Sequence, residues 1–182
     1  RRQGVRRTEG RAWESVQLAR TPERPSASYY IGSMISSFVG LHGDRLTGDD
    51  SSIIAGVGYL NKGPVMVIGQ EWKRPVKDRD RREGLTRPEG FRKAQRAMSL
   101  AAKFHLPVVT LIDTPGASRS LEAEEKGIGN AIASTLALMS QLPTPVVSVF
   151  IGEGGSEAAL ALGIGDRILM MDNAFFAPVS PE

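Results

Sequence analysis

The stretch VFIGEGGSEAALALGIGD, Val149–Asp166, decides the fold, because an apolar run meets a glycine-rich corner and continues as an alanine- and leucine-rich segment. The apolar run predicts a buried strand, and the segment after the corner predicts a helix. A strand that turns through glycines into a helix presents backbone N–H groups, which attract a negative group. The stretch therefore predicts a site for a phosphate, a cofactor or a developing oxyanion.

A second unit of the same kind lies earlier in the chain, where VVTLIDTPGA, Val108–Ala117, runs into a Pro-Gly corner. Helical patterns over 87–107, 122–145 and 156–165 alternate with the two apolar runs, and 166–182 holds two strand-like pieces. Near-continuous apolar strands that alternate with helices are typical of an α/β fold with a covered sheet.

The remaining patterns predict a short amphipathic helix over 11–26, two strands over 51–71 around a Lys62-Gly63 turn, and a charged loop over 72–87. Within the helix at 87–107, one stripe at helical spacing predicts the buried face: Phe91, Ala94, Met98, Ala101 and His105. We interpret His105 as a packed residue at the helix end rather than a ligand.

Composition narrows the class of protein. There is no cysteine, which excludes disulfides and thiolate metal sites. No apolar run reaches the roughly 20 residues that cross a membrane, and the N-terminus is polar, so we expect a cytoplasmic protein. The chain starts without methionine and ends abruptly at PVSPE, which indicates a fragment or part of a fused chain.

The formal net charge is +3, and its positive part is concentrated in residues 1–26 and 71–93. Lys73, Arg74 and Lys77 in the second segment are candidates for binding an anionic ligand or a carrier. A solvated loop is the open alternative. No motif that interleaves aromatic residues accompanies the charge, so we do not expect nucleic acid as a partner.

The corner GEGGSEA fits no common phosphate or nucleophile motif. It lacks the Lys-Ser/Thr of a P-loop, it has Glu157 where the third glycine of a dinucleotide fingerprint belongs, and GEGGS has no central serine. Two corners from consecutive strand–helix units can instead converge on one oxygen as a two-amide oxyanion hole. A purely structural use of the glycines, for a tight turn and close packing, stays open.

The candidate catalytic residues are those whose backbone N–H groups would form this hole: Gly116, Ala117, Glu157, Ala158 and Ala159. The candidate cofactor-binding residues are those of the second corner and the charged loop: Gly154, Gly155, Ser156, Lys73, Arg74 and Lys77. No histidine, cysteine or tyrosine stands out as a general base. The site therefore suits chemistry in which the reactants supply the reactive groups.

Longer stretches carry a family resemblance. AWESVQLARTPERP (12–25), RPEGFRKAQRAMSLAAKFHLPVVTLIDTPGA (87–117) and LALGIGDRILMMDNAFFAPVSPE (160–182) follow one another in the family's order. Over most of its length the chain resembles the carboxyltransferase α subunit of multi-subunit acetyl-CoA carboxylase. The resemblance implies a crotonase-like (ClpP/crotonase) α/β fold, a spiral of β-β-α units, over 27–182, after an N-terminal helical and basic segment over 1–26. It also implies truncation at the C-terminus.

The resemblance further implies transfer of a carboxyl group from N-carboxybiotin on a biotin carboxyl carrier protein to acetyl-CoA, which forms malonyl-CoA for fatty acid synthesis. The implied partner is a carboxyltransferase β-type subunit in an α2β2 assembly, and zinc is implied only on that partner. This half would hold biotin, and the partner most of the acyl-CoA.

Three segments depart from the family pattern. GASRS stands in place of G-A-Y-P-G, GGSEAA in place of G-G-S-G-G-A, and Trp72–Asp78 in place of a loop with K-G-R-D. Altered acyl-CoA specificity and a non-catalytic half that scaffolds a partner therefore remain alternatives. A stand-alone crotonase-like hydratase or isomerase is the third.

Overall fold

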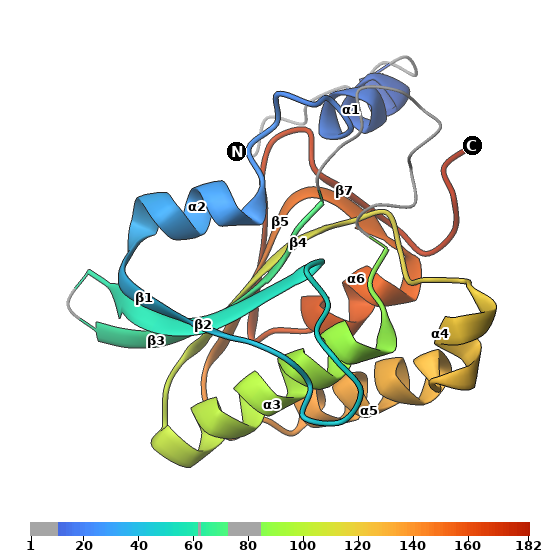
Figure 1. Cartoon of the computed structure of the whole chain (residues 1–182). Helices are drawn as coiled ribbons and strands as arrows, with labels where there is room; N and C mark the ends of the chain where they lie inside the picture. Colours follow the sequence, from blue (N-terminus) through green and yellow to red (C-terminus); the bar gives the residue numbers. More distant parts are fainter. Residues whose placement is uncertain (1–10, 62, 73–84) are drawn as a thin grey trace.

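A computed structural model describes residues 11–61, 63–72 and 85–182. A seven-stranded mixed sheet has the order β1-β2-β3-β4-β5-β6, and β7 pairs with the end of β5 (Figure 1). The first three strands are antiparallel neighbours, and the strands from β3 onward pair in parallel. The strands are β1 (Ile35–Leu41), β2 (Ile53–Leu60), β3 (Gly63–Gln70), β4 (Val108–Thr114), β5 (Val146–Gly155), β6 (Arg167–Met170) and β7 (Phe175–Ala177).

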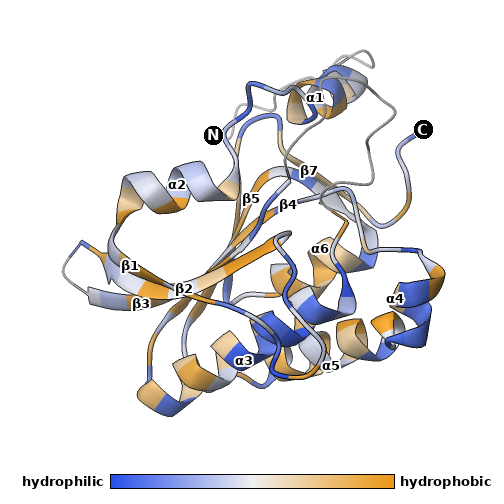
Figure 2. Cartoon of the chain, in the orientation of Figure 1, coloured by the Kyte–Doolittle hydropathy of each residue, from blue (hydrophilic) through white to orange (hydrophobic). Residues whose placement is uncertain are grey.

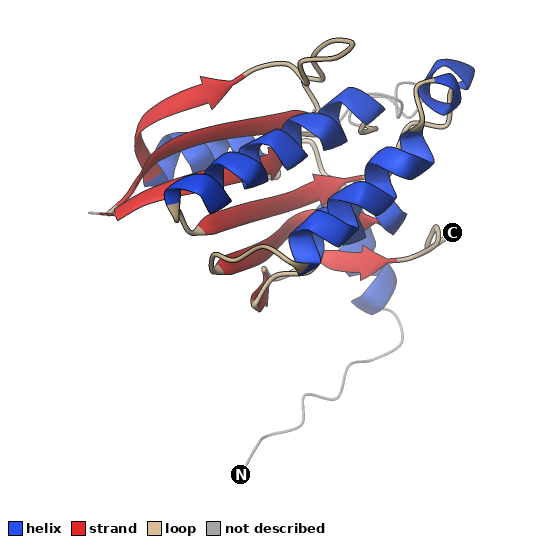
Figure 3. Cartoon of the chain, turned by 90° about the horizontal axis from the view of Figure 1, so that it is seen from below, coloured by secondary structure: helices blue, strands red, loops and turns tan. Residues whose placement is uncertain are grey.

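Helices cover both faces of this sheet. They are α1 (Arg11–Ala19), α2 (Ala27–Met34), α3 (Pro88–Phe104), α4 (Leu121–Glu125), α5 (Ile128–Ser140) and α6 (Ser156–Gly163). Helices α3 and α5 lie side by side across one face (Figure 3), and α6 packs against α5 and β4. Helix α2 packs on the opposite face. The predicted α/β fold with a covered sheet is confirmed.

Alternate residues of the central strands supply two separate cores, because successive side chains of a strand point to opposite faces. Met66 and Ile68 of β3 belong to the core under α3 and α6. Val65 and Val67 of the same strand belong to the core under α2. Figure 2 shows the hydrophobic colour along these strands and the hydrophilic colour on much of α3 and α4. Burial of both faces explains why these strands are near-continuous apolar runs.

The predicted buried stripe of α3 is correct except at its end. Phe91, Ala94, Met98 and Ala101 are fully buried. His105 is exposed, so the prediction that it packs is wrong. It forms the C-cap in the left-handed conformation (φ 54°), and its N–H donates to the carbonyls of Ala101 and Ala102. The chain turns away at this cap, which carries the side chain off the buried stripe.

Two parts of the sequence prediction need correction. No local sequence signal predicts α2 and β1, which follow one another without a break between Met34 and Ile35. The single helix predicted over 122–145 is wrong, since α4 and α5 are separate and Gly127 between them is left-handed (φ 76°). The strands predicted over 51–71 and 166–182 are confirmed.

Residues 11–26 are fixed to the end of β5 by a partly buried ion pair. Helix α1 contacts β5 and β7, and Arg20 just after it donates from Nε and Nη2 to the two carboxylate oxygens of Glu153, each at 2.8 Å. Glu153 is only 3% exposed. The hydrogen bond to Glu153 is the main cause that raises the pKa of Arg20. This pair joins elements more than 130 residues apart.

Gly32 and Gly127 test the backbone separately from packing, because a Cβ at either position would have no atom within 4 Å. Gly32 lies inside α2, so Gly32→Ala should raise the free energy of unfolding by about 0.5–1 kcal/mol. Gly127 has φ 76°, so Gly127→Ala should lower it by about 1–2 kcal/mol. Urea unfolding of the complete protein measures both changes in the free energy of unfolding. Changes of the same sign would contradict either the helical conformation of Gly32 or the left-handed conformation of Gly127.

Removing Arg20 should leave the Glu153 carboxylate buried without its cation. We expect Arg20→Met to lower the free energy of unfolding by up to about 3 kcal/mol, and Arg20→Met with Glu153→Gln to regain most of that loss. Arg45→Met changes an exposed arginine elsewhere and should leave stability unchanged. Equal stability of the single and double variants in urea would show that the pair is not what holds this segment.

Candidate functional site

The candidate site lies where β4 and β5 end next to each other. We define the first corner as residues 115–120 and the second corner as residues 152–158. Thr114 at the end of β4 pairs with Gly154. A Cβ on Gly155 would stand 2.5 Å from the backbone C and O atoms of Pro115. Any side chain at position 155 would therefore force the two corners apart.

The first corner is held by hydrogen bonds to Thr114 and Thr86, which do not involve the backbone N–H of Ala117. Gly116 has φ 143°, which favours glycine, and its N–H donates to Thr114 Oγ1 at 3.2 Å. Thr86 bridges the corner, since its N–H donates to the Gly116 carbonyl and its carbonyl accepts from Ser118 N–H. The N–H of Ala117 makes no hydrogen bond to any described residue.

The second corner opens α6 without a side-chain cap. Gly155 is the N-cap, and the first four N–H groups of a helix have no intrahelical partner. These include the N–H groups of Glu157 and Ala158, whereas Ala159 follows that first turn. Ser156 adopts a left-handed conformation (φ 48°), which is costly for a residue other than glycine. Its Oγ is buried and has no hydrogen-bond partner in the part of the chain described.

A cavity of about 550 Å³, which we call the corner cavity, lies between the two corners. Residues of both corners line it. The lining also includes Arg20, Trp72, Leu85, Phe175 and the stretch 177–182. This volume falls in the range of small-molecule sites, which is roughly 300–1,000 Å³.

The wall of the corner cavity is held by long-range polar contacts. Asp113, fully buried in β4, accepts a hydrogen bond from the N–H of Glu153 at 3.0 Å. Arg20 bonds to the Glu153 carboxylate and also pairs with Glu182. The hydrogen bond from Arg20 is the main cause that lowers the pKa of Glu182 to about 2.

Gln70 connects the sheet to the first turn of α6. It ends β3, it is 0% exposed, and its Nε2 donates to the carbonyl oxygen of Ala158 at 2.8 Å. This bond orients the first turn of α6, whose residues Ser156 and Glu157 line the corner cavity.

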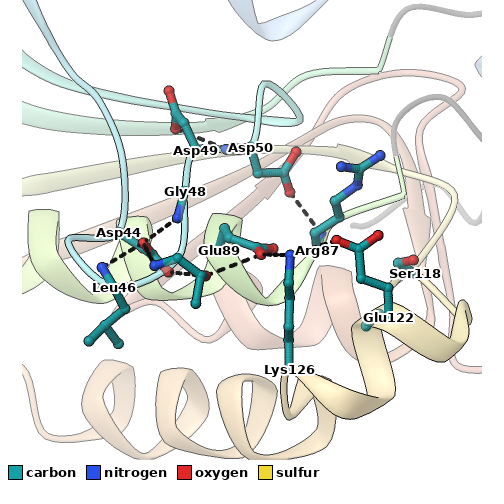
Figure 4. Close-up of polar contacts among 12 residues, drawn as sticks. Asp44, Leu46, Gly48, Asp49, Asp50, Arg87, Glu89, Ser118, Glu122 and Lys126 are labelled. Atoms are coloured by element: carbon teal, nitrogen blue, oxygen red, sulfur yellow. Dashed lines mark hydrogen bonds and ion pairs between the residues drawn. The ribbon is translucent and has the colours of Figure 1, made fainter.

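A second cavity of about 480 Å³ shares Leu85 and Arg119 with the first. A polar network beside it joins loop 42–52 to α3 and α4 (Figure 4). Lys126 Nζ contacts Glu89 at 2.8 Å and Glu122 at 2.6 Å. The network fixes α4, and with it the end of the first corner, where Ser120 Oγ accepts the N–H of Ala123.

Asp44 is the centre of the network on the loop side. Its carboxylate accepts Arg92 Nε at 2.8 Å and backbone N–H groups of its own turn, including that of Gly48. Burial alone would raise the pKa of Asp44. The hydrogen bonds from Gly48, Leu46 and Arg92 outweigh burial and lower this pKa well below its usual range.

The structure brings most of the predicted site residues to one place. The following line the corner cavity: Gly116, Ala117, Gly155, Ser156 and Glu157. Ala158 and Ala159 are fully buried beneath it, and Gly154 packs against Phe150. Lys73, Arg74 and Lys77 lie outside the described residues. The roles of all the predicted site residues in catalysis and binding stay predictions.

Sequence reasoning missed three residues that hold the site, namely Arg20, Gln70 and Glu153. Glu153 stands inside the quoted corner, but its partner lies 133 positions away and no local pattern connects them. Within the described ranges, no helix is long and apolar enough to span a membrane, and no cluster of three His, Cys, Asp or Glu side chains is placed to hold a metal ion.

The sequence matches the family model described as acetyl co-enzyme A carboxylase carboxyltransferase-like over residues 8–182. It is 50% identical over 171 residues to the acetyl-coenzyme A carboxylase carboxyl transferase subunit alpha of Teredinibacter turnerae, covering 93% of this chain and 54% of the relative. The corresponding subunit of Treponema denticola is 47% identical over 173 residues, with 94% and 57% covered. The chain thus spans about half the length of the curated relatives it matches.

Solved structures share the fold at low sequence identity. Transcarboxylase 12S matches 86% of this chain and 30% of its own with a TM-score of 0.72 at 16% identity. The beta subunit of P. aeruginosa geranyl-CoA carboxylase matches 87% and 29% with 0.70 at 17% identity. The Pseudomonas malonate decarboxylase hetero-dimer matches 90% and 69% with 0.65 at 20% identity. These matches confirm the crotonase-like fold, and with the match over residues 8–182 they show that the chain belongs to the acetyl co-enzyme A carboxylase carboxyltransferase-like family.

Proposed function

We propose that this chain is the biotin-holding half of a carboxyltransferase. The reaction would move a carboxyl group from N-carboxybiotin, carried by a biotin carboxyl carrier protein, to acetyl-CoA, and so form malonyl-CoA. The observation that carries the proposal is that two glycine corners, each with an unpartnered backbone N–H, meet at one cavity. The family of the chain supports the class of reaction.

The N–H groups of Ala117 and Glu157 are the donors we assign to the ureido oxygen of biotin. When bound, the carboxylated ureido group supplies the carboxyl group and then the base for the acetyl proton. The chain holds the negative charge that develops on the ureido oxygen. Donors that are fixed before the reaction stabilise such charge without reorganisation, and the start of α6 adds its favourable dipole. The corner cavity fits this group in size, and the two residues that carry the assigned donors line it.

The partners are also part of the proposal. A carboxyltransferase β-type subunit would supply the acyl-CoA side, and a β subunit of a carboxylase is among the structures that share the fold. Exposed apolar side chains on β6, on β7 and just after β7 support a partner contact at this edge: Ile168, Leu169, Met170, Phe176 and Val179. Zinc on that partner, the α2β2 stoichiometry and a cytoplasmic location remain predictions.

Two further proposals concern the division of the chain into domains and the charged loop. We keep the division into an N-terminal segment (1–26) and the crotonase-like domain (27–182), with Arg20 and Arg24 linking the segment to β5. We also keep Lys73, Arg74 and Lys77 as cations that attract an anionic ligand or the carrier. Electrostatic attraction of this kind weakens with added salt.

Gly155→Ala tests the proposed function, because its Cβ would meet the Pro115 backbone at 2.5 Å and separate the two corners. We expect kcat for carboxyl transfer by the complete protein with its partner to fall about 10²–10³-fold, the usual effect of losing one such donor. The transfer is measured as malonyl-CoA formed from acetyl-CoA and carboxylated carrier.

Gly165→Ala is the matched control, since its Cβ would crowd Ser148 Oγ at 2.7 Å just beyond the far end of α6 and meets no residue of either corner. We expect kcat of the control within about twofold of the parent protein, with both variants assembling normally. Parental kcat in a well-folded Gly155→Ala variant would disprove the assignment. A parent complex that assembles but transfers no carboxyl group would favour a scaffolding half instead.

A further inference from the structure

Among the described residues that line the corner cavity, two charged side chains of opposite sign have no ion-pair partner. Five of these residues have titratable side chains, namely Arg20, Arg119, Glu153, Glu157 and Glu182. Arg20 pairs with Glu153 at 2.8 Å and also with Glu182, so each of these three charges has a partner of opposite sign. Arg119 and Glu157 make no hydrogen bond or ion pair with any described residue.

The two charges come from opposite corners. Arg119 belongs to the first corner, which follows β4, and Glu157 is the second residue of α6 in the second corner. Both side chains are exposed, and the separation of their charged groups exceeds that of an ion pair. The guanidinium and the carboxylate therefore line one cavity without neutralising each other. Ala117 and Glu157, whose N–H groups are the proposed donors, line the same cavity.

We propose that Arg119 and Glu157 are specificity-determining residues that recognise two different parts of one ligand. The guanidinium binds a carboxylate, for which its planar pair of donors is well matched. The carboxylate of Glu157 accepts a hydrogen bond from an N–H. The ligand class is thus a cyclic urea or amide that carries a carboxylate on one side of its carbonyl and an N–H on the other.

This inference rests on the proposed function, because an N-carboxylated ureido ring has these three groups. Its carboxylate would face Arg119, its carbonyl oxygen the backbone donors, and its remaining N–H Glu157. Arg119 then distinguishes the carboxylated ring from the bare ring, whereas Glu157 binds both. Both residues stand in the two corner segments, GASRS and GGSEAA. The recognition accordingly depends on side chains, whereas the oxyanion is held by backbone donors.

A pair of ligands separates the two roles without any catalytic step. We would measure Kd by calorimetry on the complete protein with its partner, for biotin methylamide and for its N1′-carboxymethyl derivative, which carries a stable carboxylate. Arg119→Gln should weaken the carboxymethyl ligand about 10-fold or more and leave biotin methylamide within about twofold. Glu157→Gln should weaken both ligands by similar factors of about 5- to 10-fold.

Matched controls are Arg45→Gln and Glu124→Gln, which change exposed side chains that do not line the corner cavity. Both controls should leave each Kd within about twofold. The proposal is overturned if Arg119→Gln weakens both ligands equally or neither, if Glu157→Gln matches its control, or if the parent protein binds neither ligand. Binding with the expected pattern but without malonyl-CoA formation would support this recognition and count against the proposed function alone.

Discussion

The constraint on which the rest of the site depends is the approach of the Gly155 backbone to that of Pro115. A Cβ at position 155 would stand 2.5 Å from two backbone atoms of Pro115, so the turn from β5 into α6 can lie against the first corner only without a side chain. Parallel pairing of β4 and β5 brings the two corners to the same edge of the sheet. The missing side chain then sets how close they come, and it places the start of α6 at the corner cavity.

Contacts between distant segments keep that geometry fixed. Arg20 donates hydrogen bonds to the Glu153 carboxylate, and the Glu153 N–H donates to the Asp113 carboxylate. Gln70 donates to the carbonyl oxygen of Ala158. All three contacts are largely buried, where an unpartnered polar group is costly, so each strongly favours one arrangement. Donors that stabilise a developing charge act best when they do not have to reorganise. These three contacts therefore explain how a cavity formed largely by loops keeps its shape.

The sequence predicts the elements whose signals are local. Buried runs that end in glycine or proline predict β4, β5 and both corners, and helical spacing predicts α3. Helix α2 and β1 escape prediction because Met34 passes directly into Ile35, with no glycine or proline between helix and strand. Gly127 sits in a helical pattern, and only its positive φ divides α4 from α5. The pairing of Arg20 with Glu153 depends on the complete fold, so the sequence contains both residues but no sign that they meet.

In a site formed from backbone groups, the hydrogen-bond donors do not depend on which side chains surround them. The side chains of Ser118, Arg119, Ser120 and Glu157 could each be exchanged for another, proline excepted, without removing a backbone N–H group. What such changes must preserve is backbone conformation. Ser156 keeps a left-handed φ of 48° that is unfavourable for serine, so the surrounding contacts maintain the turn despite its cost. The chain can therefore acquire new charges at the cavity mouth, and with them new ligand selectivity, while the arrangement of its amide donors stays the same.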